Sequence, residues 1–403
     1  MPGTMAPSPP SDTRVDIVSM KLRKGEPMEI SAAFESGSID VIDASDPAQV
    51  RLALAKDKGG FVMWFHFRAI GPRDNDRAFR IENAGDATFP DGWRGYRACA
   101  SYDGRTWIRV ATEYDGRVLT IHDRPPVESV HYALAVPYSM ERHRRFIAGL
   151  QRSPFVRVGV ASRSVAGRDI DLVTVGEPAE GKAVCWVLGR QHAGETQASW
   201  FMEGFINRLI DPADAIAREA LKGTVFHIVP NVNPDGSVDG FIRSNLAGAN
   251  LNREWHDPSE VRSPEVFGVR RLMDETGVDF CLDIHADASV PFVYIEGGDA
   301  APSTSDRNIE LRERFERRLR DVNPDYEIDR RYPHLPVRGE GDLTMCLYQV
   351  AERYGALTVM LEMPFNDYDL APDTRLGWST DRSRRMGQST LDAFYAVLPD
   401  LVP

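Results

Sequence analysis

Cysteine is scarce in this chain of 403 residues, which contains only Cys99, Cys185, Cys281 and Cys346. The four lie far apart, so neither a CxxC metal-binding motif nor a disulfide framework is expected, and buried, reduced thiols are the default. Long apolar runs are also lacking, since none approaches the ~18 residues needed to span a bilayer. The first residues carry neither a basic cluster nor an apolar stretch, so no secretory signal is expected. These absences predict a cytoplasmic protein that does not interact with membranes.

The chain has fewer basic than acidic residues. It contains 48 Lys and Arg and 60 Asp and Glu, so the net charge is −12 at pH 7. Nucleic acid is therefore not an expected partner, since its binding relies on clustered basic side chains. The arginine-rich segment 306–322 fits this view, because residues of opposite charge four apart, such as Glu316 and Arg320, neutralise each other on a solvated helix face. Because the protein as a whole is negatively charged, binding of an anionic substrate would require arginines close to the binding site.

The N-terminal third has the pattern of an antiparallel β-sandwich. Residues 1–12 are rich in Pro and Ser and are expected to form a disordered tail. Between residues 28 and 137, short runs of alternating apolar and polar residues are separated by turn signals such as Asp91-Gly92. We predict about seven to nine strands in a first domain that covers residues 13–138.

After Pro137 the pattern changes to buried strands that alternate with amphipathic helices, which is typical of an α/β domain with a mostly parallel sheet. The predicted strands are 183–189, 224–230, 278–284, 291–297 and 356–362. The predicted helices are 140–150, 200–209, 263–277, 306–322, 342–354 and 380–398. This second domain is predicted to cover residues 139–403.

The segment 231–262 departs from ordinary loop statistics. It is dense in Asn, Asp, Gly and Arg and has little regular periodicity. Loops longer than ~12–15 residues are uncommon inside compact domains and are usually functional or disordered. Apolar residues such as Phe241 and Trp255 argue against disorder here, so we expect a functional loop.

Two polar residues follow the strand predicted at 183–189. His192 and Glu195 lie just beyond its carboxyl end, where ligands bind in parallel α/β sheets. The intervening Ala193-Gly194 permits a tight turn, so that both side chains can reach one cation. This pair alone is weak evidence, because HxxE occurs by chance in many chains.

A second strand end strengthens the metal interpretation. The strand predicted at 278–284 delivers His285 to the same edge, and Asp283 lies two residues earlier on the same face. Two histidines and one glutamate leave a fourth position open, which is the arrangement of catalytic zinc. Each imidazole then needs an acceptor for its other N–H, and Asp283 is a candidate for one of them. The alternative is that both histidines only form hydrogen bonds at strand ends.

Four sequence blocks together resemble a zinc metallocarboxypeptidase. They are HAGET, NPDG followed by an Arg and LNREW, DIHAD, and a Glu that ends a late strand before Pro-Phe. More narrowly, the chain is similar to the cytosolic carboxypeptidases, including bacterial members, which place a β-sandwich ahead of the peptidase domain. FRIENA, RACASYDGRTWIRV and LAVPYS resemble that sandwich. The resemblance implies an α/β fold with an N-terminal antiparallel β-sandwich, followed by a zinc-carboxypeptidase-like domain with a mixed, mostly parallel sheet.

The resemblance also assigns the metal and the base. It implies one zinc ion per chain on His192, Glu195 and His285, in agreement with the ligand chemistry above. Glu362 corresponds to the catalytic glutamate, which takes a proton from the attacking water and passes it to the leaving amine. Partial burial at a strand end would raise the pKa of its carboxyl toward the useful range. The alternative for Glu362 is a surface residue after a strand.

Substrate contacts are implied in the same way. Arg243 matches the arginine that stabilises the oxyanion, although it could instead only brace the loop. Asn252 and Arg253 match the pair that binds the terminal carboxylate, for which a planar guanidinium is suited. Eukaryotic cytosolic relatives remove glutamates, and Arg338 lies in a loop suited to binding such an acidic side chain, against a structural role as the alternative.

One feature of secreted members is not located in this sequence. They carry a mobile tyrosine upstream of the catalytic glutamate, and we assign neither Tyr332 nor Tyr348 to that position. Neither is therefore predicted to be catalytic.

The leading hypothesis is hydrolysis of C-terminal residues from peptides or proteins. A zinc amidohydrolase acting on N-acyl amino acids is the first alternative, because such enzymes share the HxxE and distant His. A noncatalytic peptide-binding protein is the second. The Asn252-Arg253 pair favours the peptidase over the amidohydrolase, and the presence of Glu362 and Arg243 beside the ligands argues against a noncatalytic protein. The oligomeric state is not predicted.

Overall fold

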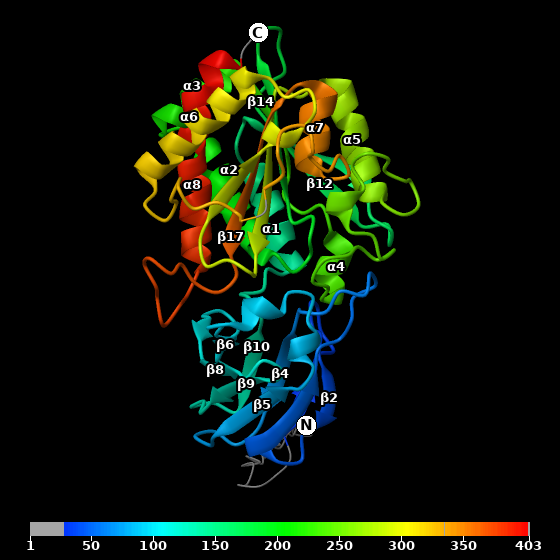
Figure 1. Cartoon of the computed structure of the whole chain (residues 1–403), viewed down its shortest axis with the longest axis vertical. Coiled ribbons are helices and arrows are strands. Elements are labelled where there is room, and N and C mark those ends of the chain that lie inside the picture. Colours follow the sequence, from blue (N-terminus) through cyan, green and yellow to red (C-terminus); the bar gives the residue numbers. More distant parts are fainter. Residues whose placement is uncertain (1–27, 334, 402–403) are drawn as a thin grey trace, which may run out of the picture.

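The computed structural model describes residues 28–333 and 335–401. The predicted tail at 1–12 and the start of the first domain lie outside the described residues. Ten strands between Glu29 and Ala133 form two five-stranded sheets, and all later strands form one seven-stranded sheet covered by helices. The two-sheet part lies at one end of the α/β part (Figure 1). Within the described ranges, no helix is both long and apolar enough to cross a membrane.

The N-terminal sheets face each other through aromatic rings. Phe67 on β4 and Tyr132 on β10 belong to the first sheet, and Phe79 on β5 belongs to the second. The ring of Phe79 lies 5.2 Å from that of Phe67 and 4.7 Å from that of Tyr132, between centroids. Such pairs add to the stabilisation from burial, so the predicted sandwich has an aromatic core.

The first sheet has the order β1, β4, β10, β6, β7, and the second has the order β2, β3, β5, β9, β8. All pairings are antiparallel except β3 with β5. The strands of the first sheet are β1 (Glu29–Ser31), β4 (His66–Ile70), β6 (Cys99–Ser101), β7 (Ile108–Arg109) and β10 (Ser129–Ala133). Those of the second are β2 (Asp40–Asp43), β3 (Val50–Ala53), β5 (Arg77–Ile81), β8 (Ala111–Tyr114) and β9 (Leu119–Asp123). The strands exceed the predicted number because several, such as β7, are too short to leave a periodic pattern.

The seven-stranded sheet has parallel strands at its centre and antiparallel strands at its edges. Its order is β11, β12, β14, β13, β15, β17, β16, and β14, β13, β15 and β17 run parallel. The strands are β11 (Val156–Arg163), β12 (Asp169–Val175), β13 (Ala183–Gly189), β14 (Thr224–Val229), β15 (Phe280–Asp287), β16 (Tyr294–Gly297) and β17 (Leu357–Pro364). The edge strand β11 was not predicted, because half-exposed residues such as Val160 interrupt its apolar pattern.

Helices cover both faces of this sheet. They are α1 (Met140–Leu150), α2 (Thr196–Leu209), α3 (Ala215–Gly223), α4 (Pro234–Asp239), α5 (Pro264–Thr276), α6 (Asp306–Val322), α7 (Cys346–Tyr354) and α8 (Thr380–Val397). Alternate residues of β13 serve the two faces, as strand geometry requires. Cys185 and Val187 pack in the same core as apolar residues of α2, α6 and α8, whereas Trp186 and Leu188 pack with those of α5 and α7 (Figure 1).

One of the predicted surface charge pairs on α6 does not lie on its solvated face. Glu316 is fully buried and does not face solvent with Arg320. Its carboxylate accepts hydrogen bonds from Arg312 at 2.8 Å and from Arg331 at 3.0 Å. A buried carboxylate needs such partners, and the two arginines supply them, one from the same helix and one from a distant loop.

The segment 231–262 is ordered by its own polar side chains. It contains α4 and a short 3₁₀ turn at Leu251–Arg253. Asn233 donates through Nδ2 to the carbonyls of Gln191 and Ser244, and Asn245 donates to Glu265 on α5. Buried irregular backbone must find hydrogen-bond partners, and amides provide both donor and acceptor atoms. This explains the abundance of Asn.

Glu265 predicts a pH dependence of stability. Burial raises the pKa of its carboxyl from 4.5 to about 7. The folded protein therefore binds a proton that the unfolded chain releases between these values, so this group's contribution to the free energy of unfolding falls as pH rises from 4.5 to 7. We expect Glu265→Gln to remove that part of the pH dependence in urea unfolding. If the free energy of unfolding changed equally with pH in both proteins between pH 5 and 7, the prediction would be contradicted.

Candidate metal centre and active-site cleft

Three chain segments meet at the carboxyl edge of the seven-stranded sheet. His192 follows β13, Glu195 immediately precedes α2, and His285 lies on β15, which pairs in parallel with β13. The turn after β13 is fixed by Arg190, whose φ of 59° is unusual for a residue with a side chain. Its buried guanidinium donates to the carbonyls of Ala193 and Tyr138 at 2.9 and 3.0 Å, which holds the turn in place.

Gly194 allows the turn to lie close to the long segment. Its N–H donates to the carbonyl of Ile242 at 2.9 Å, and a Cβ at this position would lie 2.6 Å from the Ile242 side chain. A larger residue would therefore push the two segments apart. The close approach brings Arg243, the next residue, to the same edge as His192.

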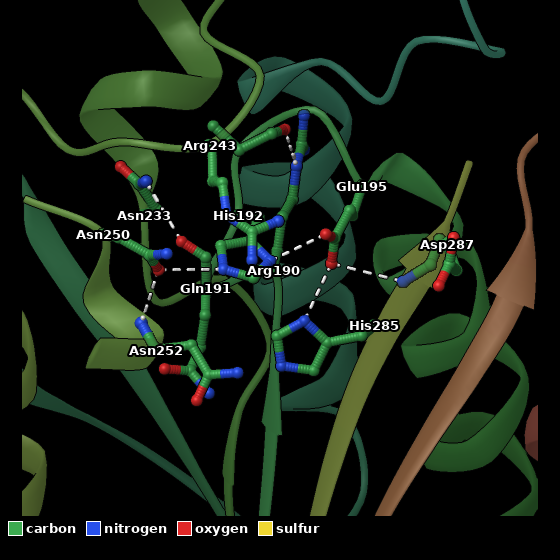
Figure 2. Close-up of polar contacts among 12 residues, drawn as sticks. Arg190, Gln191, His192, Glu195, Asn233, Arg243, Asn250, Asn252, His285 and Asp287 are labelled. Atoms are coloured by element: carbon green, nitrogen blue, oxygen red, sulfur yellow. Dashed lines mark hydrogen bonds and ion pairs between the residues drawn. The ribbon is translucent and has the colours of Figure 1, made fainter. Parts of the chain in front are cut away.

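The three predicted ligands lie together and are buried. Nδ1 of His192 lies 2.7 Å from Oε1 of Glu195, and Nδ1 of His285 lies 2.8 Å from Oε2. One candidate ligand atom from each residue lies within 4.8 Å of the others. Figure 2 shows both imidazoles turned toward the Glu195 carboxylate.

The outer nitrogen of His192 determines its protonation state. Nε2 lies 3.0 Å from Oδ1 of Asn250 (Figure 2). The same Oδ1 accepts the N–H of Asn252 at 3.1 Å, which identifies it as the amide oxygen. Nε2 must therefore carry the proton. In a neutral ring Nδ1 is then unprotonated and its lone pair points toward Glu195. Burial and the positive charge of Arg243 lower the pKa of His192 to about 4, so the ring is neutral at pH 7.

His285 is held in the same orientation by a carboxylate. Its Nε2 lies 3.0 Å from Oδ2 of Asp283, which confirms Asp283 as the predicted acceptor. Oδ2 also accepts from Nε2 of Gln191 at 2.6 Å, and Trp255 donates to the other end of that amide at 2.8 Å. Both ends of the Gln191 amide and Oδ2 of Asp283 are thus hydrogen-bonded, so the His285 ring cannot turn over without breaking its bond to a fixed carboxylate.

This donor set fits a divalent cation. Both imidazoles turn Nδ1 toward the Glu195 carboxylate. Burial lowers the pKa of His285, but the carboxylates of Asp283 and Glu195 outweigh this effect and raise that pKa well above its usual value. The negative charge that favours a proton on this ring would equally favour a bound cation, and two His and one Glu are ligands suited to zinc with a position left open. Zinc held here would be ligated through both Nδ1 atoms and the carboxylate.

Glu362 lies beside these ligands. It is paired directly with His285 in the β15–β17 register, and its Oε2 atom is buried with no hydrogen-bond partner among the described residues. Burial raises the pKa of its carboxyl well above the usual range, and the charges of Glu195 and Asp287 add to this effect. A carboxyl that has one oxygen without a partner in the described part of the chain, together with a raised pKa, is equipped to exchange a proton.

One cleft contains most of the predicted site. Its lining includes His192, Glu195 and Glu362 together with Arg243, Asn252 and Arg253. Asn252 is fixed because its Oδ1 accepts the N–H of Cys346 at 2.9 Å, and Arg253 donates to the carbonyl of Asn252 at 2.7 Å. Burial and nearby Arg243 lower the pKa of Arg253, so the two guanidinium groups interact electrostatically and make this part of the cleft attractive to anions.

Arg338 is not part of this cleft lining. Its guanidinium donates to Asp306 at 2.6 Å and to the carbonyl of Thr304, at a half-exposed position. The structure therefore does not bring Arg338 to the other predicted residues.

Several residues of the site were not predicted. Asn250 supports His192, and only its position two residues before Asn252 could have indicated it. Tyr294 lies opposite Glu362 in the β16–β17 register and donates to Asp287 at 3.0 Å, and its ring stacks on Tyr332 with centroids 5.4 Å apart. Both tyrosines line the cleft.

Comparisons with known proteins show the family of this chain. A family model described as cytosolic carboxypeptidase N-terminal domain matches residues 30–134, and one described as zinc carboxypeptidase matches residues 144–334. A metallo-carboxypeptidase from Pseudomonas aeruginosa, solved with (2-guanidinoethylmercapto)succinic acid, is 39% identical with a TM-score of 0.89, covering 93% of this chain and 100% of that one. This chain belongs to the zinc carboxypeptidase family. It is a metallocarboxypeptidase, and the family is zinc-dependent.

Other relatives of this metallocarboxypeptidase include a bacterial structure and a mouse protein. A metallo-carboxypeptidase from Burkholderia cenocepacia is 38% identical with a TM-score of 0.88 and covers 93% of this chain and 99% of that one. Cytosolic carboxypeptidase 6 of Mus musculus is 34% identical over 68% of this chain and 56% of the mouse protein. The match with the bacterial structure includes both the sandwich and the peptidase part.

Asp283 provides a test of the ligand support. Asp283→Asn keeps an oxygen acceptor but removes the negative charge that polarises His285, so we expect zinc affinity to fall about 10-fold. Competition with a chelator would measure this. Asp279→Asn is the matched control, because Asp279 accepts a backbone N–H from Val184 near the start of β15, away from the ligands. Equal affinities of the two variants would contradict the assignment.

Proposed function

We propose that the protein hydrolyses C-terminal residues from peptides or proteins at one zinc ion held by His192, Glu195 and His285. The observation that supports this most is a single cleft lined by His192, Glu195, Glu362 and two arginines, with the third ligand, His285, buried against the Glu195 carboxylate. Bound zinc would polarise the scissile carbonyl and lower the pKa of a water molecule. Side chains of the protein carry out proton transfer, stabilise the oxyanion and bind the terminal carboxylate of the substrate.

Glu362 acts as the general base and acid. Its carboxylate takes a proton from the attacking water and then passes it to the nitrogen of the leaving amine. With a divalent cation held by the three ligands, the carboxylate of Glu362 would be stabilised in its ionised form, which would offset the effect of burial on its pKa. The absence of a hydrogen-bond partner at Oε2 within the described structure leaves that oxygen available to the water.

The arginines bind the two negative charges of the reaction. Arg243, which borders the ligands through its interaction with His192, stabilises the oxyanion that forms when water attacks the carbonyl. Asn252 and Arg253 bind the terminal carboxylate of the substrate, for which the guanidinium fork provides two parallel donors. A free C-terminus is thereby selected over an internal peptide bond.

A preference for acidic C-terminal residues remains a prediction from the family resemblance alone. Arg338 gives it no support, because the guanidinium pairs with Asp306 outside the cleft lining. The lining itself contains the carboxylate of Glu296, to which the hydroxyl of Tyr348 donates. Equal turnover of peptides ending in Glu and in Leu would count against an acidic preference.

We place the reaction in the cytoplasm. All four cysteines are buried and free, although the fold is large enough to accommodate disulfides. The mouse relative is named cytosolic carboxypeptidase 6, and the family model that matches residues 30–134 is described as a cytosolic carboxypeptidase N-terminal domain.

Two substitutions separate metal binding from proton transfer. Glu362→Gln should retain zinc but reduce kcat by about 10² to 10⁴-fold, because the amide cannot accept the proton. His192→Ala should lose zinc itself, since one of three ligands is gone. Zinc analysis and kinetics on one N-blocked peptide would measure both. The mechanism is falsified if the Gln variant cleaves at the parent rate.

Substrate selection tests the proposed reaction against amide hydrolysis of small molecules. Mass spectrometry of an N-blocked peptide library should show products shortened from the C-terminus. The same peptides with C-terminal amides should react at least about 100-fold more slowly, because Asn252 and Arg253 lose their anion. Rapid cleavage of N-acetyl or N-succinyl amino acids without cleavage of peptides would instead indicate an amidohydrolase.

A further inference from the structure

Asp57 connects the sandwich to the segment that carries Arg243. It lies in the loop between β3 and β4 and is 8% exposed. Its Oδ2 accepts the backbone N–H groups of Arg243 at 3.1 Å and Ser244 at 2.9 Å. Its Oδ1 accepts those of Gly59 at 2.9 Å and Phe61 at 3.0 Å. One buried carboxylate thus holds its own loop and the Arg243 segment together.

The side chain of Arg243 is also bordered by the sandwich. Its guanidinium carbon lies 6.0 Å from the ring centroid of Phe61 and 5.4 Å from that of Phe89. Both rings come from the N-terminal part, and Phe89 lines the cleft together with Met63. Aromatic faces attract a cation within about 6 Å, so the rings restrict where the guanidinium can lie.

The two parts fit closely at this junction. The N–H of Gly59 donates to Oγ of Ser244 at 3.0 Å. A Cβ at Gly59 would lie 2.9 Å from Cβ of Ser244, and one at Gly248 would lie 2.7 Å from the carbonyl oxygen of Lys58. The contact therefore depends on small residues on both sides, which limits the freedom of the Arg243 segment relative to the sandwich.

From these contacts we infer that Asp57 is a positioning residue for Arg243, and that the sandwich is thereby part of the active site. The inference rests on the proposed role of Arg243 at the oxyanion. Hydrogen bonds from N–H groups to a carboxylate are stronger than neutral ones, especially when buried. Misplacement of a reacting group by about 1 Å can lower a rate by about 10²-fold, so anchoring the backbone of Arg243 affects the transition state.

The first experiment replaces Asp57 by Asn in the full-length zinc-loaded enzyme. In the parent protein both carboxylate oxygens of Asp57 accept backbone N–H groups. The Asn side chain replaces one of these oxygens by an NH₂ group, which cannot accept a hydrogen bond from them. We expect kcat to fall about 10 to 100-fold, while KM stays within about threefold and zinc content is unchanged. Asp115→Asn is the control, because Asp115 accepts two backbone N–H groups in a sandwich turn outside the cleft lining. Parent-like kcat in Asp57→Asn would overturn the inference.

A double-mutant cycle tests whether Asp57 acts through Arg243. Arg243→Gln alone should lower kcat about 10² to 10³-fold, as loss of an oxyanion donor does. Adding Asp57→Asn should change kcat by less than about threefold further, because the residue to be positioned is already absent. The same 10 to 100-fold loss in both backgrounds would show that Asp57 acts elsewhere and would overturn the inference.

Hydrogen exchange gives a readout that does not depend on activity. In Asp57→Asn the amides of Arg243 and Ser244 should exchange at least about 10-fold faster than in the parent, whereas Asp115→Asn should leave them unchanged. A parent enzyme that cleaves no peptide would refute the proposed function, and this exchange measurement would still decide whether Asp57 holds the segment. Unchanged exchange would refute the anchoring itself.

Phe89→Leu provides a second variant in case Asp57→Asn does not fold. It removes one of the two rings beside the guanidinium at a partly exposed position. We expect a fall in kcat of about 3 to 10-fold that disappears in the Arg243→Gln background. A loss of equal size in both backgrounds would overturn the sandwich's role in positioning Arg243.

Discussion

The site depends on one interaction, the contact of the Glu195 carboxylate with the imidazoles of His192 and His285. Each imidazole has its outer nitrogen committed, His192 to Asn250 and His285 to Asp283, so that both Nδ1 atoms converge on the carboxylate. Such convergence requires the end of β13, the start of α2 and the end of β15 to meet. Parallel pairing of β13 with β15 satisfies this, because parallel strands end at the same edge.

The same constraint explains why the segment 231–262 is irregular. It must supply Arg243, Asn250, Asn252 and Arg253 to one edge of the sheet, and a regular helix or strand would present only every second or third of its residues there. Irregular backbone buried at this depth needs hydrogen-bond partners, which side chains of the same segment provide. Composition, conformation and chemistry of this segment thus have a common cause.

The sequence allowed prediction of those parts of the site that follow buried strands. The apolar runs of β13, β15 and β17 are strong local signals, and His192, His285 and Glu362 follow from their ends together with the motif resemblance. Asp57 could not be predicted, because it meets Arg243 across 186 residues and no local pattern links them. Burial of Glu316 was missed for the same reason, since one of its partners, Arg331, lies in a loop beyond the helix. Local periodicity indicates which face is apolar, but long-range packing decides which charged residues are enclosed.

The sandwich contacts two segments of the peptidase part that line the cleft. Besides the Asp57 contact, Arg109 of β7 donates through its guanidinium to the carbonyl of Phe365 at 2.7 Å, three residues beyond Glu362. Its backbone N–H donates to the carbonyl of Arg375 at 2.7 Å. The segments that follow Glu362 and that carry Arg243 are therefore both tied to the same small domain. Relative movement of the two parts would displace both side chains with respect to His192, Glu195 and His285, so the arrangement of these residues in the cleft depends on this junction.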